Sequence, residues 1–253
     1  MLRRAEATCL ACSLLALATA AHAAHPFITD DAYTQGSGKF ELQLGSQYTR
    51  TDVEGVTLAD FQFAPQLSYG MADPIDLILR PTYSVNVASG GASSRASGWG
   101  DTNFEVKWRF LQRDPWILGI IAGTSVPSGN FNRGLDSGRS TPRAYLVTGY
   151  TAAPVEFWTS VGAIRNSDTP GARTWLGHIS GDVLWTVREG LQLGLDLAAD
   201  QNPLRASSQW PFVALVGAIL TVGNGWDVDA GYQRGLNHSA PENQILVGAT
   251  FRW

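Results

Sequence analysis

The sequence predicts an all-β fold: a transmembrane antiparallel up-and-down β-barrel of about 12 strands that follows an N-terminal signal peptide. Three observations support this prediction. Apolar and polar residues alternate with a period of two from Phe40 onward, short and long connections alternate, and the sequence ends on the apolar strand "QILVGATFRW", with Trp253 last. Strands that cross an outer membrane alternate in this way because one face meets lipid and the other meets the lumen.

Residues 1–23 have the three parts of a secretory signal peptide. Arg3 and Arg4 form a basic start, an apolar core runs over residues 8–20, and Ala21-His22-Ala23 supplies a small-x-small cleavage site. Two alternatives are an N-terminal core helix and a lipoprotein signal through Cys12, although the apolar run before Cys12 is short. We therefore expect an exported protein.

The composition of the remaining chain narrows the function classes. Without Arg3, Arg4 and Glu6, 16 basic and 21 acidic residues remain, a net charge of −5, so nucleic acid is not an expected partner. Both cysteines leave with the signal, so no disulfide is expected. Only 16% of residues are charged, against ~25% in ordinary globular chains. No later stretch reaches the ~18 consecutive apolar residues of a membrane helix, so strands would have to cross the bilayer.

The period-two pattern sets the individual strands. In "FELQLGSQYT", Phe40, Leu42 and Leu44 share one face, and Glu41 and Gln43 share the other. The same alternation predicts twelve strands, at 40–51, 60–70, 75–87, 101–111, 116–127, 142–151, 155–165, 174–187, 191–200, 210–222, 225–235 and 243–253. They form the predicted barrel, residues 40–253, which closes between the first strand and the last.

Loop lengths set the orientation. Short turns are expected at 71–74, 112–115, 152–154, 188–190 and 223–225, and long polar loops at 52–59, 88–100, 128–141, 166–173, 201–209 and 236–242. Outer-membrane barrels have short periplasmic turns and longer outside loops, so both termini are expected on the periplasmic side. Aromatic residues near both sets of connections favour two interfacial girdles. Pro65 and Pro81 lie inside predicted strands, where each removes a ladder donor, so a bulge or bend is expected at each.

Four segments resemble one known family in their order along the chain. They are "HPFITDDAYTQGSGKFELQLG", "YGMADPIDL", "GDTNFEVKWRF" and "GTSVPSGN", and the likeness extends from His25 to the C-terminal aromatic residue. The chain is similar to the outer-membrane proteins of the family labelled MetA-pathway of phenol degradation. This resemblance implies a transporter-like barrel of the bacterial outer membrane, associated with small aromatic or hydrophobic compounds.

Inward-facing positions are the candidate functional residues, because the outward face has only to satisfy the bilayer. The lumen is predicted to combine charged side chains with inward apolar residues such as Ile117, Ile121, Leu215 and Ile219. This mixture suits amphipathic solutes; a packed, closed lumen is the alternative. The predicted charged lining consists of Glu41, Asp76, Arg80, Glu105, Lys107, Arg109, Asp182, Asp196, Asp227, Asp229 and Arg252.

The polar segment 24–39 lies outside the strand pattern. It is interpreted either as a periplasmic lead-in arm or as a small plug inside the barrel, in which Asp30 and Asp31 would touch lumen bases or a cation. The expected partners of the whole protein are outer-membrane lipid, the barrel-assembly machinery through the C-terminal strand, and a small-molecule solute. No cofactor and no metal are expected.

One motif suggests an enzyme. "HIS" at 178–180 resembles the His-x-Ser arrangement of outer-membrane phospholipase A and lipid A deacylases, but Gly181 follows where those families carry Asn. His178 and Ser180 are also predicted to face the lumen, away from lipid. We therefore expect a barrel that passes or binds small molecules, and keep a lipid-modifying enzyme and a structural or adhesive barrel as alternatives.

Strand parity also predicts which charges face each other. In the hairpin around loop 88–100, a register that pairs Asp76 with Arg109 also pairs Arg80 with Glu105. In the hairpin around 188–190, pairing Trp185 with Leu193 places Asp182 opposite Asp196 and His178 opposite Asp200. The lumen would then have a neutralised wall around 75–111 and an acidic wall around 174–235, which favours cations and neutral amphiphiles.

Overall fold

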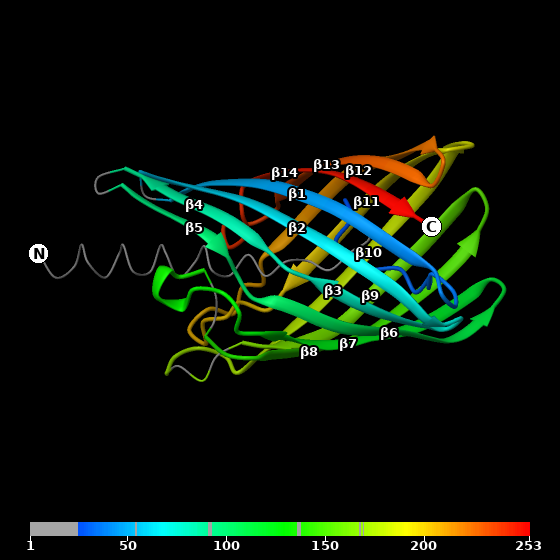
Figure 1. The fold of residues 1–253 in the computed structure, drawn as a ribbon. Coiled ribbons are helices and arrows are strands. Elements are labelled where there is room, and N and C mark those ends of the chain that lie inside the picture. Colours follow the sequence, from blue (N-terminus) through cyan, green and yellow to red (C-terminus); the bar gives the residue numbers. More distant parts are fainter. Residues whose placement is uncertain (1–24, 54, 91–92, 136–137, 167, 169) are drawn as a thin grey trace, which may run out of the picture.

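The computed structural model describes residues 25–253 apart from 54, 91–92, 136–137, 167 and 169; the predicted signal peptide lies outside the described residues (Figure 1). The described chain is a single antiparallel sheet with one short 3-10 helix, Phe131–Arg133. No helix among the described residues is long and apolar enough to cross a membrane. The strands are β1 Phe40–Val53, β2 Val56–Ala72, β3 Ile75–Arg80, β4 Tyr83–Ser89, β5 Ser94–Trp99, β6 Thr102–Arg113, β7 Trp116–Val126, β8 Thr141–Ala152, β9 Val155–Arg165, β10 Trp175–Arg188, β11 Leu191–Asp200, β12 Phe212–Gly223, β13 Trp226–Gly235 and β14 Asn243–Arg252.

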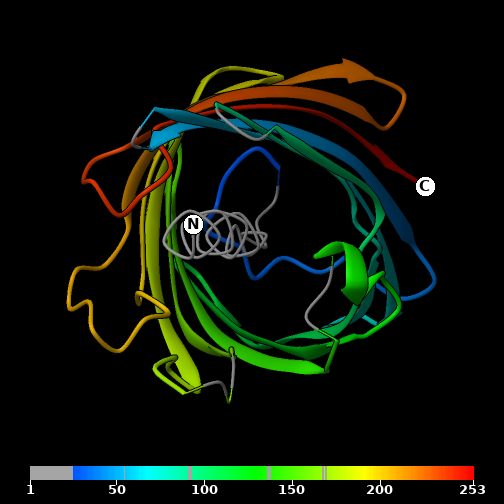
Figure 2. The same ribbon diagram turned by 90° about the vertical axis from the view of Figure 1, so that its left-hand side faces the viewer.

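These fourteen segments make twelve continuous strands around a closed barrel. β3 and β4 both pair with β2, one after the other, so together they form one interrupted strand. On their other side β4 pairs with β5 and β3 pairs with β6, so β5 and β6 form a second interrupted strand. β1 pairs with β14 from Glu41↔Arg252 to Arg50↔Asn243, which closes the sheet (Figure 2). The predicted twelve-stranded up-and-down barrel is confirmed, and closure leaves no bare sheet edge in lipid.

The break between β3 and β4 lies at the two prolines that the sequence analysis placed inside strands, Pro65 and Pro81. The β2–β3 and β2–β4 ladders share one register, in which Leu67 faces Leu79 and Phe63 faces Tyr83, so Pro65 comes opposite Pro81. Neither proline has an N–H to donate, and pairing stops between them. The β1–β2 ladder passes Pro65 without a shift, so only the other edge of β2 is broken there.

Two predicted loops are largely strand. The β1–β2 hairpin stays paired up to Val53↔Val56, inside predicted loop 52–59, and β5, which lies inside predicted loop 88–100, pairs with β4 from Tyr83↔Trp99 to Ala88↔Ser94. The hydrophobic pattern missed β5 because "SRASGW" is built mostly from small and polar residues, and it ended the preceding predicted strand at residue 87, before β4 ends at Ser89. A strand that extends beyond the bilayer needs no apolar outer face, so the period-two signal fades while the hydrogen bonding continues.

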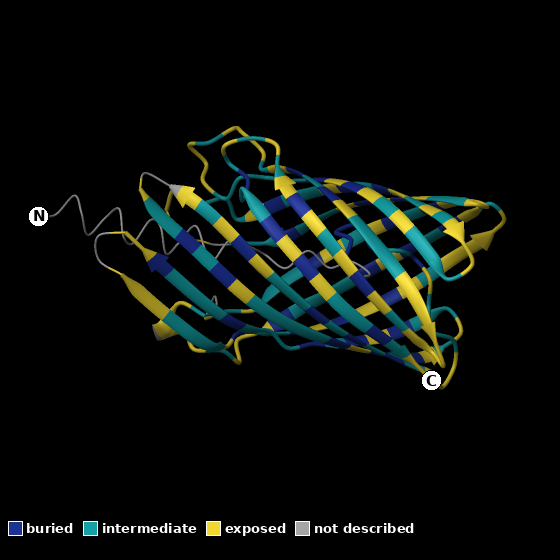
Figure 3. Cartoon of the chain, turned by 90° about the horizontal axis from the view of Figure 1, so that it is seen from above, coloured by how far each residue is buried: buried dark blue, intermediate teal, exposed yellow. Residues whose placement is uncertain are grey.

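The two faces of the barrel wall differ as the alternation requires. In β11, Leu195 is 47% exposed on the outside, whereas its neighbour Asp196 is 0% exposed on the inside. Alternating exposed and buried positions follow the strands around the whole barrel (Figure 3). Aromatic rings meet near the short turns, with Trp116 and Tyr150 at 5.0 Å and Trp226 stacked on Phe251 at 4.7 Å. The outer surface is therefore suited to lipid.

Candidate functional site

The candidate site is the lumen, and the chain's own segment His25–Lys39 enters it before β1 begins (Figure 2). Lumen-facing glycines make room for this segment. A Cβ at Gly45 would be 2.6 Å from the His25 ring, one at Gly217 would be 2.9 Å from Pro26, and one at Gly194 would overlap the Phe27 ring. A side chain at any of these positions would displace the segment, because contacts this short do not occur between real atoms.

A buried carboxylate anchors the centre of the segment. Asp196 of β11 accepts hydrogen bonds from the backbone N–H groups of Ile28 and Thr29, both at 2.7 Å, and from the Thr29 hydroxyl at 2.9 Å. His25 Nδ1 pairs with a carboxylate oxygen of Asp229 on β13. Carboxylates that accept several N–H bonds are among the strongest polar contacts in proteins. The sequence predicted Asp196 and Asp229 as lining residues but not their bonds to the N-terminal segment.

The acidic part of the segment faces β6. Lys107 Nζ lies 3.4 Å from Asp31 Oδ1 and 4.0 Å from Asp30 Oδ1. Burial raises the pKa of Asp30 well above its ordinary value, although Lys107 opposes this change. Farther along, Gln35 N donates to both carboxylate oxygens of Asp76 at 3.1 Å. The structure thus places both predicted acidic residues of the segment beside a lumen base.

An aromatic contact holds the segment to the opposite wall. The Tyr33 ring meets Trp158 of β9 edge to face at 5.0 Å, and burial raises the pKa of Tyr33 to about 12, with Glu156 adding to the rise. Trp158 is almost fully buried within the lumen. The alternation of side chains along β9 places Trp158 inside the barrel. A tryptophan in a barrel strand is more often interpreted as lipid-facing, so the sequence analysis did not name Trp158 as a lining residue.

Apolar clusters extend from the segment into the barrel wall. Phe27 and Ile28 belong to one cluster, and Ala32 belongs to a second. The other residues of the first are Ala198, Val213, Leu215 and Leu246 of the wall and Ala240 of the β13–β14 loop, and those of the second are Ile117, Ile121, Val147 and Trp158. The lumen therefore combines fixed charges with two apolar surfaces, both of which the N-terminal segment touches.

The predicted register of β3 and β6 is wrong by two residues, so Asp76 does not face Arg109, although Arg80 Nη1 still lies 3.8 Å from Glu105 Oε2 as an ion pair. The ladder pairs Asp76 with Lys107 and Arg80 with Asn103, and Arg109 instead donates from Nη2 to the Asp73 carbonyl at 3.1 Å. A hydrogen bond from Arg109 N to the Pro74 carbonyl, at 2.8 Å, fixes this register at the turn end. Because the shift is two residues, every side chain keeps its predicted face.

The predicted register of β10 and β11 is confirmed. Asp182 faces Asp196, and His178 faces Asp200. His178 Nδ1 lies 2.8 Å from Asp200 Oδ1, and its Nε2 lies 3.1 Å from Ser180 Oγ. The lumen therefore contains a Ser-His-Asp chain of hydrogen bonds. All three side chains come from inward-facing positions.

At the short-turn end, the remaining predicted lining residues form one ion-pair group. Arg252 of β14 donates from Nε to Glu41 Oε2 at 2.7 Å and pairs through Nη1 with Asp227. Arg252 thus links the first strand, the last strand and β13 across the closing seam. The structure brings these three residues together, whereas Asp76 and Asp229 contact the N-terminal segment.

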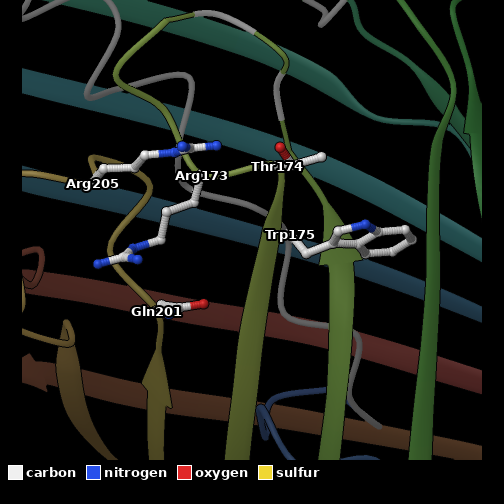
Figure 4. A pocket seen from close by; sticks show the side chains of 5 residues that line it. All are labelled: Arg173, Thr174, Trp175, Gln201 and Arg205. Atoms are coloured by element: carbon white, nitrogen blue, oxygen red, sulfur yellow. The ribbon is translucent and has the colours of Figure 1, made fainter.

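A shallow pocket of about 340 Å³ lies at the loop end, outside this lining (Figure 4). Its residues are Arg173, Thr174, Trp175, Gln201 and Arg205. Both arginines are committed to backbone carbonyls, Arg173 Nε to Asn202 at 3.1 Å and Arg205 Nε to Ala172 at 2.7 Å. We interpret the pocket as loop structure. In the part of the chain that the structure describes, no three His, Cys, Asp or Glu residues are grouped to hold a metal ion.

Solved structures share this fold. A crystal structure of an outer membrane channel from Pseudomonas putida F1 is similar with a TM-score of 0.72 at 16% identity, over 88% of this chain and 98% of that one. The translocator domain of the autotransporter NalP from Neisseria meningitidis has a TM-score of 0.56 at 12% identity, covering 99% and 97%. The NanC porin has a TM-score of 0.51 at 11% identity, covering 84% and 98%. At these identities the likeness shows the barrel fold of bacterial outer-membrane proteins.

Sequence comparison supplies the family. No curated protein matches this chain. The family model described as "Putative MetA-pathway of phenol degradation" matches residues 23–253, essentially the whole barrel and the segment that enters it. With its barrel, its lumen and this match taken together, the chain belongs to that family.

Proposed function

We propose that this protein is an outer-membrane channel that passes or binds small aromatic or amphipathic molecules, and that segment His25–Lys39 is its plug. The observation that carries the proposal is the lumen itself, in which fixed charges and two apolar clusters are enclosed by a barrel with an apolar outer wall. A solute with a polar end and an apolar body matches such a lining. The similarity to a channel and to a porin supports the same function.

The orientation we propose places both termini in the periplasm. The short-turn end carries Phe40 and Trp253, whose backbone groups hydrogen-bond to each other at 3.0 and 3.1 Å. Outer-membrane barrels keep their short turns on the periplasmic side. Outer-membrane lipid is then the partner of the outer wall, and the barrel-assembly machinery recognises the C-terminal strand. Protease digestion of intact cells, with epitopes placed in loop 201–209 and in turn 188–190, tests this orientation.

Single-channel recording in planar bilayers tests the channel. We expect a small conductance that phenol-like aromatics reduce, and a larger conductance in Asp196→Ala, which removes the acceptor of three plug hydrogen bonds. Asp168→Asn, in an exposed loop, is the matched control. A barrel that conducts nothing even after Asp196→Ala would instead favour a structural role with a closed lumen.

The Ser180-His178-Asp200 chain supports one other function, a serine hydrolase. An acyl transfer site also needs donors for the developing oxyanion. Around Ser180 the backbone is paired on both sides, with Ser160 of β9 and Ala198 of β11. We therefore infer that the protein is not an enzyme. A fluorophosphonate probe should not label the purified barrel; labelling that disappears in Ser180→Ala would reverse this conclusion.

A further inference from the structure

Two arginines and one glutamate reach the same part of the lumen from three strands. Arg80 of β3 places Nη1 3.8 Å from Glu105 Oε2, and Arg143 of β8 places Nη1 3.8 Å from Glu105 Oε1. Glu105 and Arg143 both face Gly123 of β7, and their side chains meet across that glycine. A Cβ at Gly123 would be 2.6 Å from Glu105 Cγ, so the glycine is what allows the approach.

The group has more positive than negative charge, and it is desolvated. The side chains of Arg80, Arg143 and Glu105 are 7%, 5% and 1% exposed. The arginines' other hydrogen bonds go to neutral acceptors: Arg80 to Gln66 Oε1, and Arg143 to Asn103 Oδ1 at 2.6 Å. One carboxylate therefore serves two buried guanidiniums, each at a distance too long for a direct hydrogen bond.

Both guanidiniums keep an unused donor. Among the described residues, Arg80 Nη1 and Arg143 Nε are buried and have no hydrogen-bond acceptor. A buried charged donor without an acceptor is costly, and an oxyanion removes that cost by accepting from both. The site is thus short of one negatively charged acceptor.

The side chains around the two arginines indicate which kind of anion would suit these donors. Tyr145 lies two residues from Arg143 on the same inward face, edge to face with His178 at 5.5 Å, and is paired with Ile121 of β7. Ile121 belongs to the apolar cluster that contains Trp158. An anionic head held by the arginines would therefore have an aromatic and aliphatic surface beside it for its body.

We propose that Arg80 and Arg143 form a carboxylate-binding subsite for small aromatic acids inside the barrel, with Glu105 as the internal competitor for the same donors. This inference rests on the proposed function and names its solute class. It reverses the solute preference that the sequence predicted, because that prediction treated the wall around 75–111 as neutral and left out Arg143. Phenols and other neutral aromatics would use the apolar surface without the arginines.

Equilibrium dialysis of the purified full-length barrel against benzoate tests the subsite at neutral pH, with benzyl alcohol as the neutral control. Benzoate should bind more tightly than benzyl alcohol. Arg80→Gln/Arg143→Gln should weaken benzoate binding about tenfold or more, since a charge-assisted hydrogen bond is lost at each site, and should leave benzyl alcohol unchanged. Arg165→Gln, in an exposed ion pair near the loops, is the matched arginine control.

Glu105→Gln supplies the opposite test. Removing the competitor should tighten benzoate binding, a gain that misfolding cannot produce, and heat-modifiable migration checks that each variant folds. Equal benzoate binding by wild type and both variants would overturn the subsite, as would benzoate binding no tighter than benzyl alcohol. Because dialysis measures binding, this failure is distinct from that of the channel, which would show as the absence of conductance in bilayers.

Discussion

At the scale of single residues, the absence of side chains shapes the lumen as much as their presence. Gly45, Gly194, Gly217 and Gly248 belong to β1, β11, β12 and β14, and the N-terminal segment lies against all four. In strands, glycine is unfavourable unless another backbone or ligand approaches closely. Here the chain's own His25, Pro26 and Phe27 are that close group.

The glycine contacts predict that a side chain at Gly194 releases the plug. Gly194→Val should leave the barrel intact, because valine suits strands, but overpacking against Phe27 costs about 1–3 kcal/mol. Residues 24–253 contain no cysteine, so Ile28→Cys in a chain that begins there can report plug exposure by its rate of maleimide labelling. We expect labelling about tenfold faster with Gly194→Val. Gly181→Val, where an added Cβ is 3.4 Å from its nearest neighbour, should not change the rate.

Asp30 predicts a pH dependence of plug docking. Its pKa is raised on docking by burial, with Lys107, Glu105 and Asp31 as the neighbouring charges. The docked segment keeps a proton that the released segment loses above its ordinary pKa of 3.8, so docking is strongest below that pH and weakens as pH rises through the docked pKa. Relative to an Asp30→Asn chain, Ile28→Cys labelling should accelerate from pH 4 to pH 8, by at most about tenfold per pH unit. A ratio that stays constant with pH would contradict this role.

At the scale of the strand, the pairing of β1 with β14 closes the barrel. Phe40 and Trp253 exchange two backbone hydrogen bonds, and their rings stack at 5.4 Å. Arg252 adds ion pairs to Glu41 and Asp227 on the inner face of the same seam. The last three residues thus contribute to both faces of the closing ladder.

Deleting Phe251–Trp253 should lower the amount of heat-modifiable barrel in outer-membrane fractions severalfold, because the seam loses backbone bonds, ring stacking and the Arg252 ion pairs together. Trp253→Phe keeps the backbone bonds and an aromatic ring, so it should assemble almost normally. Unchanged barrel levels after the deletion would show that closure does not depend on this end of β14.

At the scale of the whole molecule, the lumen is polarised, but not as charge counting along the hairpins suggested. Asp182 and Asp196 face each other on β10 and β11, and Asp196 accepts three hydrogen bonds from the plug. Asp182 Oδ1 is buried and has no hydrogen-bond partner in the part of the chain that the structure describes. The basic group of Arg80 and Arg143 belongs to other strands of the same barrel.

Asp182→Asn should therefore shift the ion selectivity of the lumen toward anions, because it removes an acidic group of β10 that the plug does not bond and leaves the basic group of Arg80 and Arg143. Reversal potentials across a salt gradient measure this selectivity, and the effect should be largest at low ionic strength, where screening is weak. Asp168→Asn, in an exposed loop pair with Arg165, controls for net charge. No shift at low salt would place Asp182 outside the ion path.

The sequence alone determined the barrel, its twelve strands and the inward or outward face of most strand positions, because side chains alternate with a period of two along a strand. It also determined the β10–β11 register, since a short turn leaves little freedom between Trp185 and Leu193. Only the tertiary structure decided the β3–β6 register, where two facing prolines and an extended hairpin intervene. Only the tertiary structure also decided that Gly45, Gly194, Gly217 and Gly248 line the N-terminal segment, because closure brings their strands around it. It likewise decided that Arg80 of β3 and Arg143 of β8 reach the same carboxylate, because that contact depends on the registers of β3, β6, β7 and β8 together.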